Sequence, residues 1–564
     1  MSKLVRETEN ALRQAVLDAM GKAATQGALP AEPVPAFTVE VPADRANGDY
    51  ATNAAMACAK AFRMAPRKIA QEIAARIELA GAFFSRCEIA GPGFLNFFLD
   101  DSYYAAILRD IRACGKNYGR SDYGRGKRVM VEFVSANPTG PMHMGNARGG
   151  ALGDCLAAAL DYAGFEVCRE FYVNDAGNQI EKFALSLEVR YLQHYLGENA
   201  VELPEDSYHG DDIRVRAEEF AAVYGDRYVT AAAEERRKAL VAFALPKNIE
   251  SMQATLSKYR IHYDNWFYES TVHQDGELQE TIELFKQAGL TYEKDGALWY
   301  KATERGAEKD EVLVRANGNP TYFAADVAYH RNKLIKRGYD QAIDIWGADH
   351  HGHVARMKGA LEAIGIDSSR LDVILMQLVR LVSGGEVVRM SKRTGKAITL
   401  TDLLDDIPVD AARFLFNLRE PGSQMEFDLD LAVEQSAQNP VYYCQYAHAR
   451  ICSILKKLAG EGVTPRGCTQ EELGLLSAPE ERALIRHLSA LTDEIVNAAK
   501  NYDPARITRY VIELATLFHK FYNACRVRVE EEPLMQARIE LCVCVRDTIR
   551  NVLEMLKITA PESM

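Results

Sequence analysis

The sequence predicts a multidomain α/β protein whose central domain is a doubly wound parallel sheet of the Rossmann-like type. The chain has 564 residues, which is too long for a single domain of about 100 to 200 residues. Its central part alternates between strand, glycine-rich loop and helix patterns. Strand and helix patterns are mixed before this part, whereas only helical patterns follow it.

Residues 1–115 are predicted to form a small N-terminal α+β domain. Apolar residues recur at helical spacing over residues 4–20, and glycine and prolines end that helix. Residues 37–41 then alternate as in a strand.

The central domain is expected over residues 116–385. The segment RVMVEF, residues 128–133, is a buried strand pattern, followed by a Gly/Pro loop and a helix with apolar residues at i, i+3 and i+4. This order is typical of the first crossover of a doubly wound domain. We expect a charged helical insertion at about residues 185–285, after which the sheet resumes near QAIDIWGADHH and again at DVILMQLVRL.

Two further segments complete the chain. Residues 386–435 are interpreted as a basic loop and a connecting segment. Residues 436–564 show helical spacing throughout and predict a C-terminal all-α helical bundle.

Composition limits the possible cellular locations, metal sites and binding partners of the protein. The opening residues carry charges of both signs, and no run approaches the ~18 apolar residues of a membrane span, so we expect a cytoplasmic protein. Eleven cysteines without a C-x-x-C pair argue against a disulfide framework and a thiolate zinc site. A net charge of -12 opposes indiscriminate nucleic-acid binding but permits a local grip on folded RNA.

Two segments carry candidate phosphate chemistry. NPTGPMHMGNARGG, residues 137–150, puts His143 between a strand and the amino end of a helix, where backbone N–H groups favour phosphate. VVRMSKRTGK, residues 387–396, is a cationic loop that could close on the β- and γ-phosphates. Taken alone, the histidine would more often cap the helix, and the basic run would more often be a solvated turn.

Together these segments resemble the HIGH and KMSKS elements of class I aminoacyl-tRNA synthetases. Asn146 stands where a second histidine is usual, and Arg389 where a first lysine is usual. In WGADHHGH, residues 346–353, the resemblance implies that the glycine lies beside adenine and that the aspartate binds the ribose. The histidines of this segment could also suggest a zinc site, but they lack the H-E-x-x-H spacing of a catalytic zinc motif. The resemblance implies catalytic roles for His143, Asn146 and Lys392, and ATP binding by His143, Gly145, Asn146, Gly347, Asp349, Met390, Ser391 and Lys392.

Acidic residues suggest a cationic amino acid. Glu132 interrupts an apolar strand, and a buried carboxylate needs a cation, which the substrate could supply. Tyr322 and Asp326 are four residues apart, so a helix would place them on one face; the alternative for Asp326 is an exposed helix charge. A guanidinium suits such a carboxylate through bidentate hydrogen bonds.

The stretch VEFVSANPTGPMHMGNARGG is similar to arginyl-tRNA synthetases specifically. The similarity implies arginine binding by Glu132, Asn137, His143, Glu269, Tyr322, Asp326 and His350. FYVNDAGNQI, residues 171–180, also resembles this family, which implies that Asn174, Asp175 and Gln179 support the pocket from behind.

Both ends of the chain carry candidate RNA contacts. An aromatic, amide, aromatic row includes Phe94 and Asn96, and a later helix combines tyrosines with arginine. Taken alone, both patterns more often reflect plain core packing. The resemblance implies tRNA contacts by Phe94, Asn96, Tyr443, Tyr446, Arg450, Arg526 and Met564.

The resemblance therefore implies an arginine–tRNA ligase that uses ATP, with Mg²⁺ carried on the nucleotide and no protein-bound metal. It also implies tRNA(Arg), ATP and L-arginine as partners, with no DNA and no membrane, and a monomer. Two alternatives stay open: a non-catalytic RNA-binding paralogue, and another class I-like adenylyl-transferring enzyme.

Overall fold

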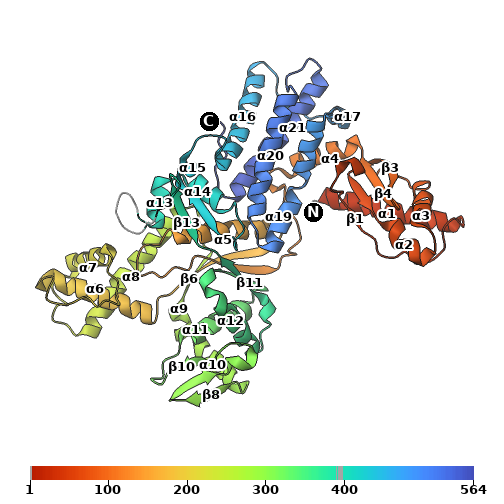
Figure 1. The fold of residues 1–564 in the computed structure, drawn as a ribbon. Helices are drawn as coiled ribbons and strands as arrows, with labels where there is room; N and C mark the ends of the chain where they lie inside the picture. The colour runs from red at the N-terminus through yellow and green to blue at the C-terminus, as the bar shows by residue number, and fades with distance from the viewer. Residues whose placement is uncertain (1–2, 389, 391–397) are drawn as a thin grey trace.

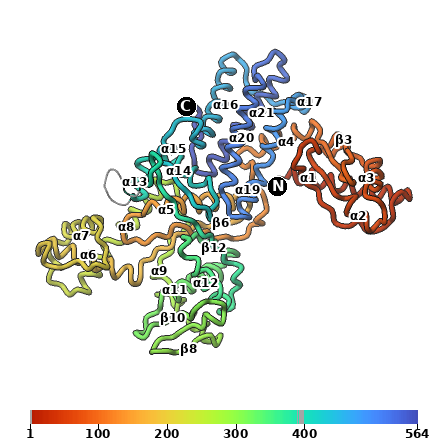
Figure 2. The backbone as a smooth tube through the Cα atoms, in the orientation of Figure 1, coloured from red at the N-terminus to blue at the C-terminus, as the bar shows by residue number. Residues whose placement is uncertain are grey.

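The computed structural model describes residues 3–388, 390 and 398–564. Figure 1 shows a central α/β body, a separate N-terminal body in red and a helical bundle in blue. The N-terminal body and the yellow helical insertion project on opposite sides of the molecule (Figure 2). Among the described helices, none is long and apolar enough to cross a membrane.

The N-terminal body is α+β, as predicted. Its antiparallel sheet has the order β1-β2-β4-β3, and the strand expected over residues 37–41 shortens to β1. Leu95 and Phe97 of β4 point into the core with no exposed surface. The elements are α1 (Lys3–Thr25), β1 (Val39–Glu40), β2 (Tyr50–Thr52), α2 (Ala54–Phe62), α3 (Pro66–Ala74), β3 (Phe84–Ala90), β4 (Phe94–Leu99) and α4 (Asp101–Cys114).

The central sheet is parallel and doubly wound, which confirms the predicted fold class. Its order is β12-β11-β5-β6-β7, with chain connections running outward from β5 in both directions. The strands are β5 (Arg128–Glu132), β6 (Glu166–Val173), β7 (Asn265–Tyr268), β11 (Gln341–Gly347) and β12 (Leu371–Met376). The strand order reverses between β5 and β11, and ligands of such sheets bind at the carboxyl ends of the strands flanking this point.

Helices on both faces complete this domain. α5 (Gly145–Tyr162) follows β5 and is buried along most of its length, as its apolar spacing predicts. α11 (Tyr322–Arg331) continues into a π-helical turn (Asn332–Lys336) that leads to β11, and α12 (His351–Ala363) follows β11.

The insertion is shorter than expected. α6 (Asn178–Leu196), α7 (Asp211–Tyr224) and α8 (Ala233–Lys258) form a module with its own apolar core. The sheet strand β7 lies inside the range 185–285, because its four residues are too few for the strand pattern to stand out. α9 (Glu269–Gln274), α10 (Glu277–Gln287) and an unpredicted antiparallel sheet follow: β8 (Thr291–Lys294), β9 (Ala297–Tyr300) and β10 (Glu311–Val314).

DVILMQLVRL forms two strands in different sheets. Its first part is β12, and its second begins β13 (Val379–Ser383), which pairs with β14 (Glu386–Val388) and β15 (Met425–Asp428). α13 (Leu400–Asp406), α14 (Val409–Phe416) and α15 (Leu429–Val433) connect this sheet to the bundle. The bundle contains α16 (Pro440–Gly460), α17 (Gln470–Gly474), α18 (Pro479–Ser489), α19 (Leu491–Asn501), α20 (Ala505–Ala524) and α21 (Glu532–Met555).

Arg413 joins three distant parts of the chain. This fully buried side chain donates from Nε to the Leu556 carbonyl at 2.7 Å and from Nη1 to the Tyr259 carbonyl at 3.0 Å. It also donates from Nη2 to Asp154 of α5. The end of the bundle, the end of the insertion and α5 therefore meet at one guanidinium.

Candidate active site

A cavity of about 630 Å³ opens at the carboxyl ends of β5 and β11, at the reversal of strand order. Its volume is typical of small-ligand sites. Residues from β5, α9, α11, β11 and α12 line it. They include Glu132, Glu269, Tyr322, Asp326, Gly347, Asp349 and His350 of the predicted set.

Three carboxylates lie side by side across the sheet beneath this cavity. Asp344 of β11 is the register partner of Glu132 of β5, and Glu132 is the partner of Glu170 of β6. Register partners on neighbouring strands point to the same face. All three are buried, so the row would be strongly unfavourable without cations.

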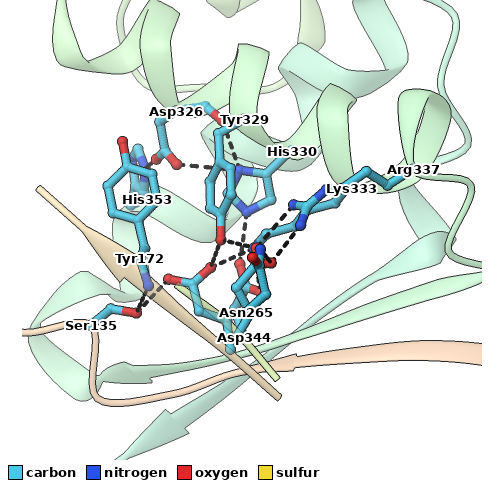
Figure 3. A network of polar contacts seen from close by, with 12 residues as sticks. Ser135, Tyr172, Asn265, Asp326, Tyr329, His330, Lys333, Arg337, Asp344 and His353 are labelled. Atoms are coloured by element: carbon cyan, nitrogen blue, oxygen red, sulfur yellow. Dashed lines mark hydrogen bonds and ion pairs between the residues drawn. The ribbon is translucent and has the colours of Figure 1, made fainter. Parts of the chain in front are cut away.

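Cations from the π-helical turn that follows α11, and from its C-terminal end, neutralise the row (Figure 3). Lys333 Nζ, fully buried, donates to Glu132 Oε2 at 2.5 Å and to Asp344 Oδ1 at 2.9 Å. Arg337 donates to both carboxylate oxygens of Glu170, and the Tyr329 hydroxyl bridges Glu170 and Glu132.

This arrangement corrects the sequence argument for Glu132. Glu132 lines the cavity, but the cation that meets it is Lys333 rather than a substrate. Its other oxygen accepts from Ser135 Oγ at 2.8 Å. Burial raises the pKa of Glu132, while the Lys333 ammonium opposes that rise.

Asp326 lies on the cavity wall, on the same side of α11 as Tyr322. Its Oδ2 lies 2.6 Å from His353 Nε2, and its Oδ1 lies 3.2 Å from His330 Nδ1. Burial would raise the pKa of Asp326, but the two histidines hold it well below its usual range. Each carboxylate oxygen has a second lone pair free for a ligand, because such an oxygen accepts two hydrogen bonds.

Glu269 closes another side of the cavity at the start of α9. It is only 3% exposed, and burial raises its pKa above the usual value. The Asn174 amide nitrogen, in its hydrogen-bonding orientation, lies 2.9 Å from Glu269 Oε2. Asp175 accepts from Ser270 N at 2.8 Å and from Ser270 Oγ at 2.6 Å, which fixes the start of α9.

Gly347 ends β11 at the cavity rim, followed by Asp349 and His350, both exposed. A Cβ atom on Gly347 would lie 2.4 Å from Asp349 Oδ1. Glycine at this position therefore gives the Asp349 carboxylate room to lie against the backbone. Among the described residues, no group of three or more His, Cys, Asp or Glu side chains is arranged to hold a metal ion.

His143 lies beside the cavity rather than among its lining residues, in the loop that enters α5. Its Nδ1 accepts from the Gly145 amide at 3.1 Å, so a neutral ring carries its proton on Nε2. The loop is paired with the chain just after residue 397: Met144 N donates to the Ile398 carbonyl at 3.0 Å, and Leu400 N to the Met142 carbonyl at 2.8 Å. Ser391 and Lys392 lie outside the described residues, and Met390 is exposed.

Asn137 is the predicted pocket residue that the structure does not bring to the cavity. It is exposed in the loop after β5 and is absent from the cavity lining. Gln179 accepts a hydrogen bond from the Tyr208 hydroxyl and also stays outside the lining. Sequence reasoning missed Lys333, His330 and Asp344, although Asp344 repeats the signal seen at Glu132, a single acid within an apolar strand.

The candidate RNA contacts differ in accessibility. Phe94 is half-buried, but Asn96 is only 6% exposed, because β2 and β3 flank it. In the bundle, Tyr443, Tyr446 and Arg450 line a second cavity of about 400 Å³ together with Tyr442, His519 and Asn523. The Arg450 guanidinium lies 5.2 Å from the Tyr446 ring centroid. Arg526 and Met564 are exposed and do not line this cavity.

The doubly wound sheet, the cavity at its switch point and the glycine-containing loop at the start of α5 define a class I aminoacyl-tRNA synthetase. Three family models match consecutive parts of the chain. "Arginyl tRNA synthetase N terminal domain" matches residues 8–99, "tRNA synthetases class I (R), catalytic domain" residues 109–453, and "DALR anticodon binding domain" residues 444–564.

Curated proteins narrow the assignment. An arginine–tRNA ligase of Caldanaerobacter subterraneus is 55% identical and one of Ruminiclostridium cellulolyticum 54% identical, each over the whole of both chains. The Thermus thermophilus arginyl-tRNA synthetase structure, at 24% identity, shares the fold with a TM-score of 0.71 over 98% of this chain and 100% of that one. The chain belongs to the arginyl-tRNA synthetase family, as its motifs predict.

Proposed function

We propose that the chain acts as an arginine–tRNA ligase whose amino-acid pocket is the cavity at the carboxyl ends of β5 and β11. ATP and arginine form arginyl-adenylate and pyrophosphate, and the arginyl group then passes to the terminal ribose of tRNA(Arg). One observation carries this proposal: Tyr322, Asp326 and Glu269 line the same cavity as Gly347 and Asp349.

In the arginine site, Asp326 accepts two parallel hydrogen bonds from the substrate guanidinium, and Tyr322 lies beside it. Charge-assisted bidentate bonds of this kind are shorter and stronger than neutral ones. Burial raises the pKa of Glu269 although His273 lies 3.6 Å from it, so a second cation from the substrate would stabilise its ionised form. Arginine is contacted by the cavity-lining residues Glu132, Glu269, Tyr322, Asp326 and His350.

In the ATP site, the amino end of α5 faces the phosphates, and Asp349 accepts from the ribose hydroxyls. Mg²⁺ arrives with the nucleotide. ATP is contacted by His143, Gly145, Asn146, Gly347, Asp349, Met390, Ser391 and Lys392. The described residues support this site because the loop that contains His143 is hydrogen-bonded to Ile398 and Leu400. These two residues follow the segment that contains Lys392 in the sequence.

The chemistry follows from these positions. The arginine carboxylate attacks the α-phosphorus in line, and His143, Asn146 and Lys392 stabilise charge as the bond to pyrophosphate breaks. The tRNA ribose hydroxyl then attacks the adenylate carbonyl, and AMP leaves.

The tRNA is contacted at both ends of the chain. Residues 1–115 hold the elbow, the insertion faces the acceptor end, and residues 436–564 hold the anticodon. The cavity formed by Tyr446 and Arg450 offers ring faces with a cation beside them, which suits an unstacked base. The contacts are Phe94, Asn96, Tyr443, Tyr446, Arg450, Arg526 and Met564, and a monomer acting in the cytoplasm suffices for this scheme.

Aminoacylation with each of the twenty amino acids and total tRNA tests the proposal. Only arginine should be esterified, and only to its own tRNA. Adenylate formation without any transfer to RNA would favour a different adenylyl-transferring enzyme. The absence of any product would favour a non-catalytic paralogue. We also expect ATP–pyrophosphate exchange without tRNA to stay near background.

A further inference from the structure

Both ring nitrogens of His330 face oxygen acceptors. Nδ1 lies 2.8 Å from the Asp326 carbonyl oxygen, and Nε2 lies 2.7 Å from Asp344 Oδ2. A neutral imidazole has a single N–H and would turn a lone pair toward one of these oxygens. The side chain is 1% exposed, so water cannot relieve such a mismatch. Burial would raise the pKa of Asp344, but Lys333 bonds this carboxylate and helps to hold it ionised by lowering that pKa. Both contacts of the ring therefore need an N–H donor, and the ring is the doubly protonated imidazolium.

His330 lies between Asp344 on the central sheet and Asp326 on α11 (Figure 3). Asp344 belongs to the acidic row on the sheet, whereas Asp326 is the carboxylate proposed to bind the substrate guanidinium. The imidazolium touches both, through Nε2 on one side and through Nδ1 on the Asp326 backbone and side chain on the other. It thus connects the pocket carboxylate to the central sheet.

We propose that His330 is a positioning residue for arginine recognition, a permanently protonated histidine that keeps Asp326 ionised and correctly oriented in the empty pocket. This inference rests on the proposed role of Asp326 and adds a group that does not itself contact arginine. A partly desolvated carboxylate is easier to protonate than one in bulk water, and protonation would remove its charge before the guanidinium arrives. The neighbouring imidazolium prevents that protonation.

The charged groups around His330 agree with this role. Lys333 on the π-helical turn opposes the protonated form, whereas Asp344 on β11 and Asp326 on α11 favour it. Glu132 on β5 lies on the far side of Lys333, and His353 on α12 faces Asp326 rather than His330. Although burial and Lys333 would lower it, the two aspartates raise the pKa of His330 to about 10.

The inference predicts a specific pH dependence. In the wild type, Asp326 is already ionised throughout the neutral range, so the KM for arginine should be flat from about pH 6 to 8. In His330→Gln, Asp326 loses its strongest cationic neighbour and its pKa rises. The KM for arginine should then increase about tenfold or more and climb further as the pH falls, with a much smaller change in kcat.

The test compares aminoacylation kinetics of His330→Gln, His330→Asn and Asp326→Asn across this pH range. Glutamine can still reach toward Asp344 and asparagine toward Asp326, but neither carries charge. His487 is a half-buried histidine in the bundle whose ring lies 2.9 Å from the Tyr510 carbonyl. His487→Gln is the control for loss of a histidine and should leave the arginine KM unchanged. In Asp326→Asn, the KM should be high and independent of pH.

Each result has a distinct meaning. A His330→Gln profile parallel to that of the wild type, or equal losses in kcat and in the ATP KM, would overturn the positioning role. An unchanged arginine KM in Asp326→Asn would instead overturn the proposed pocket. If both His330 variants fail to fold, nitrogen chemical shifts of labelled histidine in the wild type decide, since imidazolium signals at about pH 8 are expected and a neutral ring would refute the inference.

Discussion

Thr399 lies opposite His143 in an isolated antiparallel bridge. The chain that follows residues 391–397 is therefore fastened to the loop that starts α5, although the two segments are far apart in sequence. Lys392 stands only a few residues before this bridge in the sequence. The bridge therefore supports the proposal that His143 and Lys392 act in one reaction.

Removal of either group should slow the chemical step. Losing a donor that stabilises transition-state charge typically costs about 2 to 4 kcal/mol, so His143→Ala and Lys392→Ala should each lower kcat by about 10² to 10³-fold with little change in the arginine KM. Single-turnover adenylate formation in the presence of tRNA measures this. Turnover close to that of the wild type in either variant would remove that residue from the mechanism.

Asp326→Asn should weaken arginine binding more than turnover. A charge-assisted bond to a buried carboxylate contributes about 1.5 to 3 kcal/mol, which corresponds to a rise in arginine KM of about 10- to 150-fold. Glu311→Gln is the matched control, because Glu311 lines the same cavity but is paired with Arg356 at 2.6 Å. Similar effects of both substitutions would argue for a general field effect and against a specific contact.

Two glycine substitutions should separate ligand binding from stability. A Cβ on Gly347 would displace the exposed Asp349 side chain, so Gly347→Ala should raise the KM for ATP and leave Tm nearly unchanged. A Cβ on Gly153 would lie 2.2 Å from Phe133 Cγ in the core. Gly153→Ala should therefore destabilise the fold by about 1 to 3 kcal/mol. Thermal melts and ATP titrations distinguish the two, and an unchanged ATP KM in Gly347→Ala would contradict the adenine site.

Arg450→Ala should reduce affinity for tRNA and lower its salt dependence, since Arg450 sits over Tyr446 at the second cavity. Arg526→Ala, outside that cavity, should have a smaller effect. Filter binding at several salt concentrations compares them. An equal loss in both variants would indicate that the bundle attracts RNA through distributed charge instead of a base-sized site.

Stability should respond to alkali through His330. Its folded pKa of about 10 lies above the value of ~6.5 expected in the unfolded chain, so protonation stabilises the fold fully below pH ~6.5. That contribution disappears as the pH rises from ~6.5 toward 10. Wild-type Tm should fall more steeply than that of His330→Gln over this window. Identical slopes in the two melts would mean that the ring is neutral in the folded protein.

The sequence was sufficient for the architecture wherever a pattern was long or repeated. The helix α5, the strand β5 and the all-α C-terminal bundle follow from periodicity. The four-residue strand β7 and the small sheet β8–β10 do not, because short strands carry too few residues for alternation to be recognised.

The site was predictable in part. Spacing correctly grouped Tyr322 with Asp326, since both belong to one helix. Lys333 could not be linked to Glu132 in this way, because their pairing depends on a π-helical turn and on the sheet register, neither of which has a local sequence signature. The consequence was that the countercharge of Glu132 was assigned to the substrate.

The Arg413 junction has a consequence for biosynthesis. Asp154 and Tyr259 are translated before Arg413, but its third partner, the Leu556 carbonyl, is made only near the end of synthesis. Until then a buried guanidinium has an unfilled donor, which costs about 1 to 3 kcal/mol. The catalytic half should thus be only loosely assembled on the ribosome and tighten when the last helix docks, so that nascent chains lacking α21 are more readily cleaved by proteases than the finished enzyme.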